Sequence, residues 1–184
     1  MSQKTAVLIT GIPGTGKSTL VKKLMKDTGD DYKLQEPIKM LKMMVGRYNV
    51  IGDYSDPNEI FPGGDRLSMS VSVQFKEWVR NSKPHNIIIE GDRLVGNDTI
   101  DFLIGEDYDV LVIGLTVDQK IVEERYSKRG SNQNETFLKS KATKVGNVMK
   151  RLDLAFDDRI LILPHENENH TDVINKAIVA HLDK

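Results

Sequence analysis

The chain of 184 residues contains no cysteine, and this absence excludes a disulfide framework, a thiolate nucleophile and zinc or iron–sulfur sites built on cysteine. Long apolar runs are also missing, so we expect neither a signal peptide at MSQKTAVLIT nor a membrane span. No charge of one sign dominates, because 26 Lys and Arg stand against 27 Asp and Glu. This composition predicts a soluble globular protein without a membrane partner, and a cytoplasmic location.

No repeat, low-complexity tract or linker interrupts the sequence, so we expect one domain over residues 1–184. Four apolar runs predict strands buried on both faces: Ala6–Ile9, Asn86–Glu90, Val110–Leu115 and Ile160–Leu163. A weaker fifth strand is expected at Asp31–Gln35. Helices are expected at about 17–28, 37–46, 97–105, 118–128, 135–156 and 171–182. The alternation predicts an α/β fold with a five-stranded parallel sheet flanked by helices, which binds its ligands at the carboxyl ends of the strands.

The segment around residues 67–75 fits two patterns. It alternates like a half-buried strand, but it also places Leu67, Val71 and Phe75 on one helical face. We favour a helix that begins with Asp65 as its cap and extends to about Asn81. The preceding residues 46–64 are rich in glycine and proline and predict a long loop of the kind that is usually functional.

A phosphate-binding motif follows the first strand directly and precedes a helix-compatible run. The motif is G-x-x-x-x-G-K-S, and the residues expected to bind nucleotide are Gly11, Ile12, Pro13, Gly14, Thr15, Gly16, Lys17, Ser18 and Thr19. Its glycines allow backbone N–H groups to surround phosphate oxygens, Lys17 reaches the β- and γ-phosphates, and the Ser18 hydroxyl can bind Mg²⁺. The motif therefore predicts ATP and Mg²⁺ as cofactors, but it leaves the phosphate acceptor open.

Acidic and basic side chains come directly after the strand Asn86–Glu90. Glu90 or Asp92 can hold Mg²⁺ through water, or accept a proton from an acceptor hydroxyl, and Arg93 would enter the same crevice. Since the motif at residues 11–18 marks this edge of the sheet as the active one, we expect these residues to be catalytic or metal-binding.

Arginines at the ends of other predicted elements are candidates for binding phosphoryl oxygens. Arg66 follows Asp65, while Arg125 and Arg129 lie on one helical face before a polar stretch. We expect a lid at about residues 126–140 that closes over the triphosphate. The segment from Lys120 to Arg151 holds nine basic and three acidic residues, a net charge of +6 that suits either a triphosphate or a nucleic-acid backbone.

With these motifs, the sequence resembles the nucleoside monophosphate kinase superfamily, and within it the thymidylate kinases. The matching features, in chain order, are the P-loop, Glu36-Pro37, Asp65-Arg66, Asp92-Arg93-Leu94, and the spaced Arg125 and Arg129. The loop GIPGTGKS is more similar to that of adenylate, shikimate or polynucleotide 5′-kinases. GGDRLSMS, EGDRL and TKVGN look similar to phage-type members that phosphorylate 5-hydroxymethyluracil in DNA, which would place the protein in the host cytoplasm.

The resemblance implies Mg²⁺-dependent transfer of the ATP γ-phosphate to a pyrimidine-nucleotide-type acceptor, either a nucleoside monophosphate or 5-hydroxymethyluracil in DNA. It implies that Arg66 and Arg93 bind the acceptor, that Glu36 and Tyr54 line its pocket, and that a homodimer can form. Arg125, Arg129 and Lys144 would stabilise the transferring group, and the HENENH loop after the last strand would border adenine. For a hydroxyl acceptor, Asp65, Asp92 or Glu36 would be the base. The alternatives are a polynucleotide 5′-hydroxyl kinase, another small-molecule kinase, an NTPase, or a nucleotide-binding module without catalysis.

Overall fold

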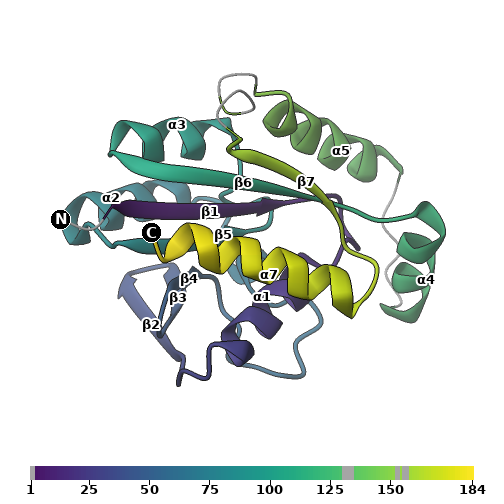
Figure 1. Cartoon of the computed structure of the whole chain (residues 1–184), viewed down its shortest axis with the longest axis horizontal. Helices are drawn as coiled ribbons and strands as arrows, with labels where there is room; N and C mark the ends of the chain where they lie inside the picture. The colour runs from purple at the N-terminus through teal and green to yellow at the C-terminus, as the bar shows by residue number, and fades with distance from the viewer. Residues whose placement is uncertain (1–2, 130–134, 152–153, 155–157) are drawn as a thin grey trace.

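The fold is built on a mixed seven-stranded sheet with the strand order β2-β3-β4-β5-β1-β6-β7 (Figure 1). The structure is a computed structural model, and it describes residues 3–129, 135–151, 154 and 158–184. Five neighbouring strands are parallel: β4 (Asn49–Ile51), β5 (Asn86–Glu90), β1 (Lys4–Thr10), β6 (Tyr108–Thr116) and β7 (Ile160–Pro164). The α/β architecture is confirmed, but the sheet has seven strands rather than the five expected.

The two additional strands extend the sheet at its β4 edge. β2 (Lys33–Ile38) and β3 (Leu41–Val45) form a hairpin, and β3 pairs antiparallel with β4. The strand expected at Asp31–Gln35 is therefore an antiparallel edge strand, and the fifth parallel strand is β4 instead. Since β4 has only three residues, it offers no periodic pattern by which the sequence could reveal it.

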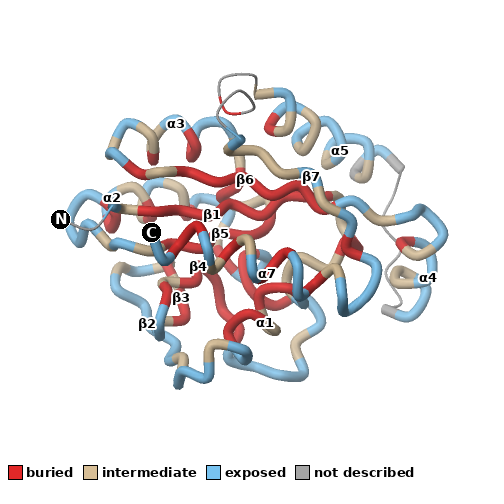
Figure 2. Tube along the Cα trace, viewed as in Figure 1, coloured by how far each residue is buried: buried red, intermediate tan, exposed pale blue. Residues whose placement is uncertain are grey.

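Helices cover both faces of the sheet, as the alternating pattern predicted. Ala6 and Leu8 of β1 face a cluster formed with α2 (Ser72–Ser82), α3 (Asn97–Gly105) and α5 (Glu135–Met149). Val7 and Ile9 face the opposite cluster, formed with α1 (Lys17–Asp27) and α7 (Glu168–Leu182). Figure 2 shows the buried residues concentrated along the central strands between these layers. β1 is thus buried on both sides, which fixes the position of the loop that follows it.

The expected helix at about 37–46 is wrong. Met40 has a φ of 75° and turns the chain so that Ile38 pairs with Leu41 across a tight hairpin. The following strand β3 then buries Leu41 and Met43 against the sheet. Leucine, methionine and lysine have good intrinsic helix propensity, but that preference amounts to tenths of a kcal/mol per residue and burial in the sheet outweighs it.

The helix expected from Asp65 begins later, at Ser72. Asp65 lies in the short 3-10 helix η1 (Gly64–Arg66) and does not cap α2, whose N-cap residue is Val71. Leu67 is extended, with φ of -77° and ψ of 154°, and separates the two helices. A Cβ on Gly64 would lie 2.2 Å from the carbonyl oxygen of Glu90, so close backbone packing ties η1 to the end of β5. This contact places Asp65 at the active edge of the sheet.

Candidate active site

The phosphate-binding loop occupies residues 11–16, between the end of β1 and the first residue of α1. Gly14 and Gly16 have φ values of 86° and 85°, which favour glycine. The Lys17 ammonium donates to the carbonyl oxygens of Gly11 at 2.9 Å and Ile12 at 3.3 Å. Lys17 thus lies folded over the loop and must exchange these bonds for phosphate oxygens when a nucleotide binds.

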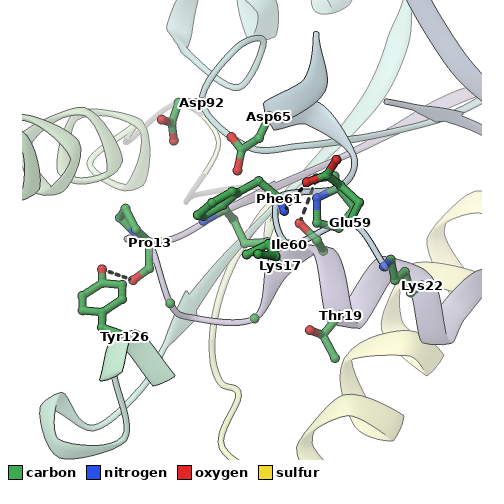
Figure 3. Close-up of a pocket in the computed structure, with 14 residues that line it drawn as sticks. Pro13, Lys17, Thr19, Lys22, Glu59, Ile60, Phe61, Asp65, Asp92 and Tyr126 are labelled. Atoms are coloured by element: carbon green, nitrogen blue, oxygen red, sulfur yellow. Dashed lines mark hydrogen bonds between the residues drawn. The ribbon is translucent and has the colours of Figure 1, made fainter. Parts of the chain in front are cut away.

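A cavity of about 220 Å³ lies between this loop and the segment Glu59–Pro62 (Figure 3). Of the predicted residues, Pro13, Gly14, Gly16, Lys17, Ser18, Thr19, Asp65 and Asp92 line it. Five of its other lining residues lie in segments expected to be functional: Glu59, Ile60, Phe61 and Pro62 in the loop of residues 46–64, and Tyr126 at the start of the expected lid. Lys22 of α1 was not expected there. The cavity therefore joins the expected donor site to the aspartates of the two predicted Asp-Arg pairs.

Glu90, the last residue of β5, is a buried carboxylate that does not line the cavity but contacts its lining residue Ser18. Its Oε1 accepts hydrogen bonds from the Tyr54 hydroxyl at 2.9 Å, the Gly64 N–H at 3.0 Å and the Ser18 hydroxyl at 3.2 Å. Burial raises the pKa of Glu90, although the Lys17 charge and the Gly64 and Tyr54 hydrogen bonds favour its ionised form. Burial also raises the pKa of Tyr54, so its phenol stays protonated and donates.

The Ser18 hydroxyl and Glu90 fit a magnesium ion that is bound mainly through phosphate oxygens and water. Both offer oxygen, the ligand that Mg²⁺ prefers, where the end of β5 meets the start of α1. Within the described ranges, no group of three or more His, Cys, Asp or Glu residues could hold a metal ion.

Asp65 and Asp92 project toward the cavity from the side opposite α1 (Figure 3). Asp65 is open to the cavity, yet the surrounding protein buries it enough to raise its pKa, while the charge of Lys17 lowers that pKa and the charge of Asp92 raises it. Asp92 forms an ion pair with Lys141 of α5, and Lys144 donates to its carbonyl oxygen. Burial lowers the pKa of Lys144. The carboxylate of Asp65 is therefore the less neutralised of the two.

The predicted arginines lie in different surroundings. Arg66 does not line the cavity: it binds Glu59 at 3.1 Å and Asp53 at 3.6 Å. Arg93 lies close enough for its charge to lower the pKa of Asp65, and its buried Nε has no hydrogen-bond partner among the described residues. Arg129 ends α4 (Gln119–Arg129), and its side chain lies outside the described residues, as do residues 130–134 of the expected lid.

Arg125 lies beside the phosphate-binding loop. Its guanidinium donates to the carbonyl oxygens of Gly14 at 2.9 Å and His165 at 3.3 Å. His165 is the first residue of the HENENH segment and follows β7; only residues 165–167 of this expected loop precede α7, which begins at Glu168. His165 is buried, and its Nδ1 lies 2.7 Å from the carbonyl oxygen of Thr15. The structure therefore brings the end of β7 to the donor site.

Glu36 and Tyr54 do not line the cavity. Glu36 is exposed on the edge strand β2, where its carboxylate accepts from the N–H of Met40 at 2.6 Å. Tyr54 is buried behind the cavity and acts on Glu90, as described above. Of the residues expected to contact the acceptor, Arg93 therefore remains beside the cavity.

Lys22 is the missed residue that carried a signal in the sequence, because it lies four residues after Ser18 and so shares its helical face. His165 belongs to the HENENH segment that was expected to border adenine, and it follows a buried strand, where parallel sheets place ligand-binding groups. Ile60 and Phe61 lie in the loop that was expected to be functional, but which of its residues line the cavity depends on how the loop between β4 and η1 folds.

Comparison with known proteins extends these observations. Similar solved structures include a gluconokinase from Sinorhizobium meliloti 1021, with a TM-score of 0.51 and 12% identity over 100% of this chain and 94% of that chain. They also include a sugar kinase from Janibacter sp. HTCC2649, with a TM-score of 0.52 and 14% identity over 98% of this chain and 95% of that chain. A search of curated proteins finds no match. In the described residues no helix has the length and apolar character needed to cross a membrane. The family model described as an AAA domain matches residues 7–146, so the chain belongs to this family of P-loop proteins and has the fold of the P-loop kinases.

Proposed function

We propose that this protein is an ATP- and Mg²⁺-dependent kinase that phosphorylates a hydroxyl group. The observation that carries the proposal is the carboxylate of Asp65, which lines the cavity opposite α1 and forms no ion pair with the described residues, whereas Asp92 and Glu59 are paired with Lys141 and Arg66. A monophosphate acceptor would bring up to two negative charges toward this carboxylate. Arg66, the residue expected to bind such a phosphate, is engaged by Glu59 and Asp53. A hydroxyl acceptor instead requires a carboxylate as general base.

Asp65 is the residue we assign as this base. Its raised pKa strengthens it as a proton acceptor, and Asp92 is neutralised by Lys141. In the proposed step, the acceptor oxygen attacks the γ-phosphorus, its proton passes to Asp65, and the bond from the γ-phosphorus to the bridging oxygen breaks to release ADP. Lys17 and Arg93 stabilise the charge on the transferring group. Mg²⁺, when bound, neutralises charge on the β- and γ-phosphates, with Ser18 and Glu90 as the residues that would hold it.

The acceptor is proposed to carry a flat ring, as a pyrimidine nucleotide with a hydroxymethyl group does. Ile60 and Phe61 line the cavity and are 56% and 43% exposed. An aromatic side chain and a branched aliphatic one at the entrance of a polar cavity form a surface on which a base can stack. An open-chain polyol would leave this surface in water. A sugar or sugar-acid hydroxyl is the second candidate, since the two similar structures named above are described as a gluconokinase and a sugar kinase.

The test is incubation with labelled ATP and Mg²⁺ against a panel of acceptors: dTMP, gluconate, 5′-hydroxyl DNA, and DNA with and without 5-hydroxymethyluracil. Label on a hydroxyl is the expected outcome, and label on hydroxymethyluracil identifies the base-bearing acceptor. Transfer to dTMP alone would overturn the hydroxyl proposal. ATP hydrolysis that no acceptor changes would indicate an NTPase, and nucleotide binding without turnover would indicate a binding module.

Asp65→Asn tests the assignment of the base. We expect kcat to fall by about 10²- to 10⁴-fold, the usual contribution of a general base, while the Kd for ATP stays within about twofold. Asp98→Asn is the matched control, because Asp98 is an exposed aspartate on α3 whose ion pair with Lys76 lies outside the cavity. Equal kcat values for the two variants would refute the role given to Asp65.

A further inference from the structure

Three consecutive carbonyl groups of the phosphate-binding loop accept hydrogen bonds from side chains that lie outside the loop. The Tyr126 hydroxyl donates to Pro13 at 2.6 Å, which Figure 3 shows, and Arg125 donates to Gly14 at 2.9 Å. The Nδ1 of His165 lies 2.7 Å from the carbonyl oxygen of Thr15. Two of these side chains come from α4, and the third follows β7.

These bonds fix the orientation of three peptide groups. In a trans peptide, the C=O of one residue and the N–H of the next point in opposite directions. Holding the carbonyl groups of residues 13, 14 and 15 outward therefore directs the N–H groups of residues 14, 15 and 16 inward. The N–H of Thr15 is used within the loop, where it bonds to Ile12 at 3.3 Å, while those of Gly14 and Gly16 face the place of an anion.

The bond from His165 to Thr15 requires a proton on Nδ1, because a carbonyl oxygen only accepts. Burial lowers the pKa of the imidazole, which favours the neutral ring with its proton on Nδ1. Nε2 lies 3.0 Å from the Thr171 hydroxyl, which also lies 3.2 Å from the carbonyl oxygen of Asn167. A Cβ on Gly16 would lie 2.8 Å from the imidazole ring. The ring thus packs directly against the last glycine of the loop and holds it against the start of α1.

We propose that Tyr126, Arg125 and His165 are positioning residues that hold the phosphate-binding loop in its anion-binding form before the nucleotide arrives. These three side chains affect the affinity for nucleotide through the backbone of residues 13–15. Their hydrogen bonds go to the carbonyl oxygens of these residues, so the N–H groups of the loop stay available to bind phosphate. A loop that is already ordered loses less conformational entropy when the ligand binds. Since coupling is reciprocal, bound nucleotide in turn stabilises the attachment of α4. The inference rests on nucleotide binding at this loop and is independent of the acceptor.

The chain offers a closely matched pair of variants for the test. Tyr126→Phe removes a tyrosine hydroxyl that donates to a proline carbonyl at 2.6 Å, and Tyr108→Phe removes the same bond, to Pro84 at 2.6 Å, outside the cavity. Isothermal titration with MgADP should show a Kd about five- to tenfold weaker for Tyr126→Phe, where tenfold corresponds to about 1.4 kcal/mol. Tyr108→Phe should bind MgADP as the unmodified protein does. Equal affinity of the two variants would refute the proposal.

His165 allows a rescue experiment. In His165→Asn the amide nitrogen can replace Nδ1 and donate to Thr15, whereas in His165→Gln the amide extends toward the position of Nε2. We expect His165→Asn to keep the Kd for MgADP within about twofold and His165→Gln to weaken it about five- to tenfold. Amide NMR shifts of Gly14 and Gly16 in the unliganded protein should move only in the weakened variants. Weakening by both substitutions with unmoved shifts would indicate a merely structural role, while an unmodified protein that fails to bind MgADP would refute the proposed function instead.

Discussion

Tyr54→Phe should destabilise the protein through the buried Glu90 carboxylate. The substitution removes the 2.9 Å bond to Oε1 and leaves the Ser18 and Gly64 bonds in place. A hydrogen bond to a charged group contributes about 1.5–3 kcal/mol. For a chain of this size 1 kcal/mol corresponds to about 2–4 °C in Tm, so we expect Tm to fall by about 3–12 °C. Urea unfolding and differential scanning calorimetry give the two measurements.

Tyr48→Phe is the control for this prediction. Tyr48 donates to Asp183 at 3.1 Å, but that carboxylate is 34% exposed and also binds Arg47. Water and the arginine can replace the lost bond, so the free energy of unfolding should fall by less than about 1 kcal/mol. Equal losses of unfolding free energy for the two variants would show that the burial of Glu90 does not increase the contribution of its hydrogen bond to stability.

The loss in Tyr54→Phe should also depend on pH. The Tyr54 bond lowers the pKa of Glu90 and so stabilises the ionised carboxylate more than the protonated one. The difference in unfolding free energy between the unmodified protein and the variant should therefore be larger at pH 7, where ionised Glu90 needs its donors, than at acidic pH, where Glu90 is protonated. A difference that grows as the pH falls would refute this reasoning.

Three further predictions concern other parts of the site. Gly63→Ala places a Cβ 2.4 Å from the Glu90 carboxylate and the Tyr54 ring, at a φ of 79°. We expect this substitution to lower the free energy of unfolding in urea by about 2–4 kcal/mol. Gly29→Ala is the control, because Gly29 has a φ of 73° but open space around its Cβ position, and it should lower that free energy by about 1 kcal/mol. Ser18→Ala should raise the Mg²⁺ concentration needed for half-maximal phosphotransfer at least about tenfold in a metal titration, and chelation of Mg²⁺ should abolish transfer in the unmodified protein. Burial lowers the pKa of His165 and of His181 in the folded protein, so as the pH falls both imidazoles bind protons in the unfolded chain before they do so in the folded protein. The free energy of unfolding should therefore decrease as the pH falls from 7.5 through 6.5. An increase over this range would contradict the burial of both rings.

The elements that local patterns could predict are those in which one physical cause dominates. The buried strands are continuous apolar runs, and the phosphate-binding loop needs particular residues at particular offsets, so both were found. β3 was missed because leucine and methionine are compatible with either a helix or a strand, and pairing with a three-residue neighbour decided the outcome. The propensities of the residues in β3 carry no information about its pairing with β4.

In the candidate site, too, local patterns predicted some residues, while others depend on tertiary contacts. Asp65 and Asp92 could be placed in the cavity because each follows a predictable strand or loop end. The ion pairs of Arg66 could not be predicted, because its partners Asp53 and Glu59 come from a loop whose path depends on tertiary contacts. An arginine beside a phosphate site can bind substrate or neutralise a neighbouring carboxylate, and only the folded chain distinguishes the two.

The bridge between Asp53 and Gly63 has a consequence for engineering. Two backbone hydrogen bonds, at 2.8 and 3.2 Å, join the ends of the intervening segment, so its nine residues form a closed unit. Doubling the length of such a closed loop costs only about 0.6 kcal/mol in closure entropy. The interior of this segment, including Ile60 and Phe61, is thus suited to randomised libraries or to transplantation between proteins of this fold, with the sheet and the phosphate-binding loop left unchanged.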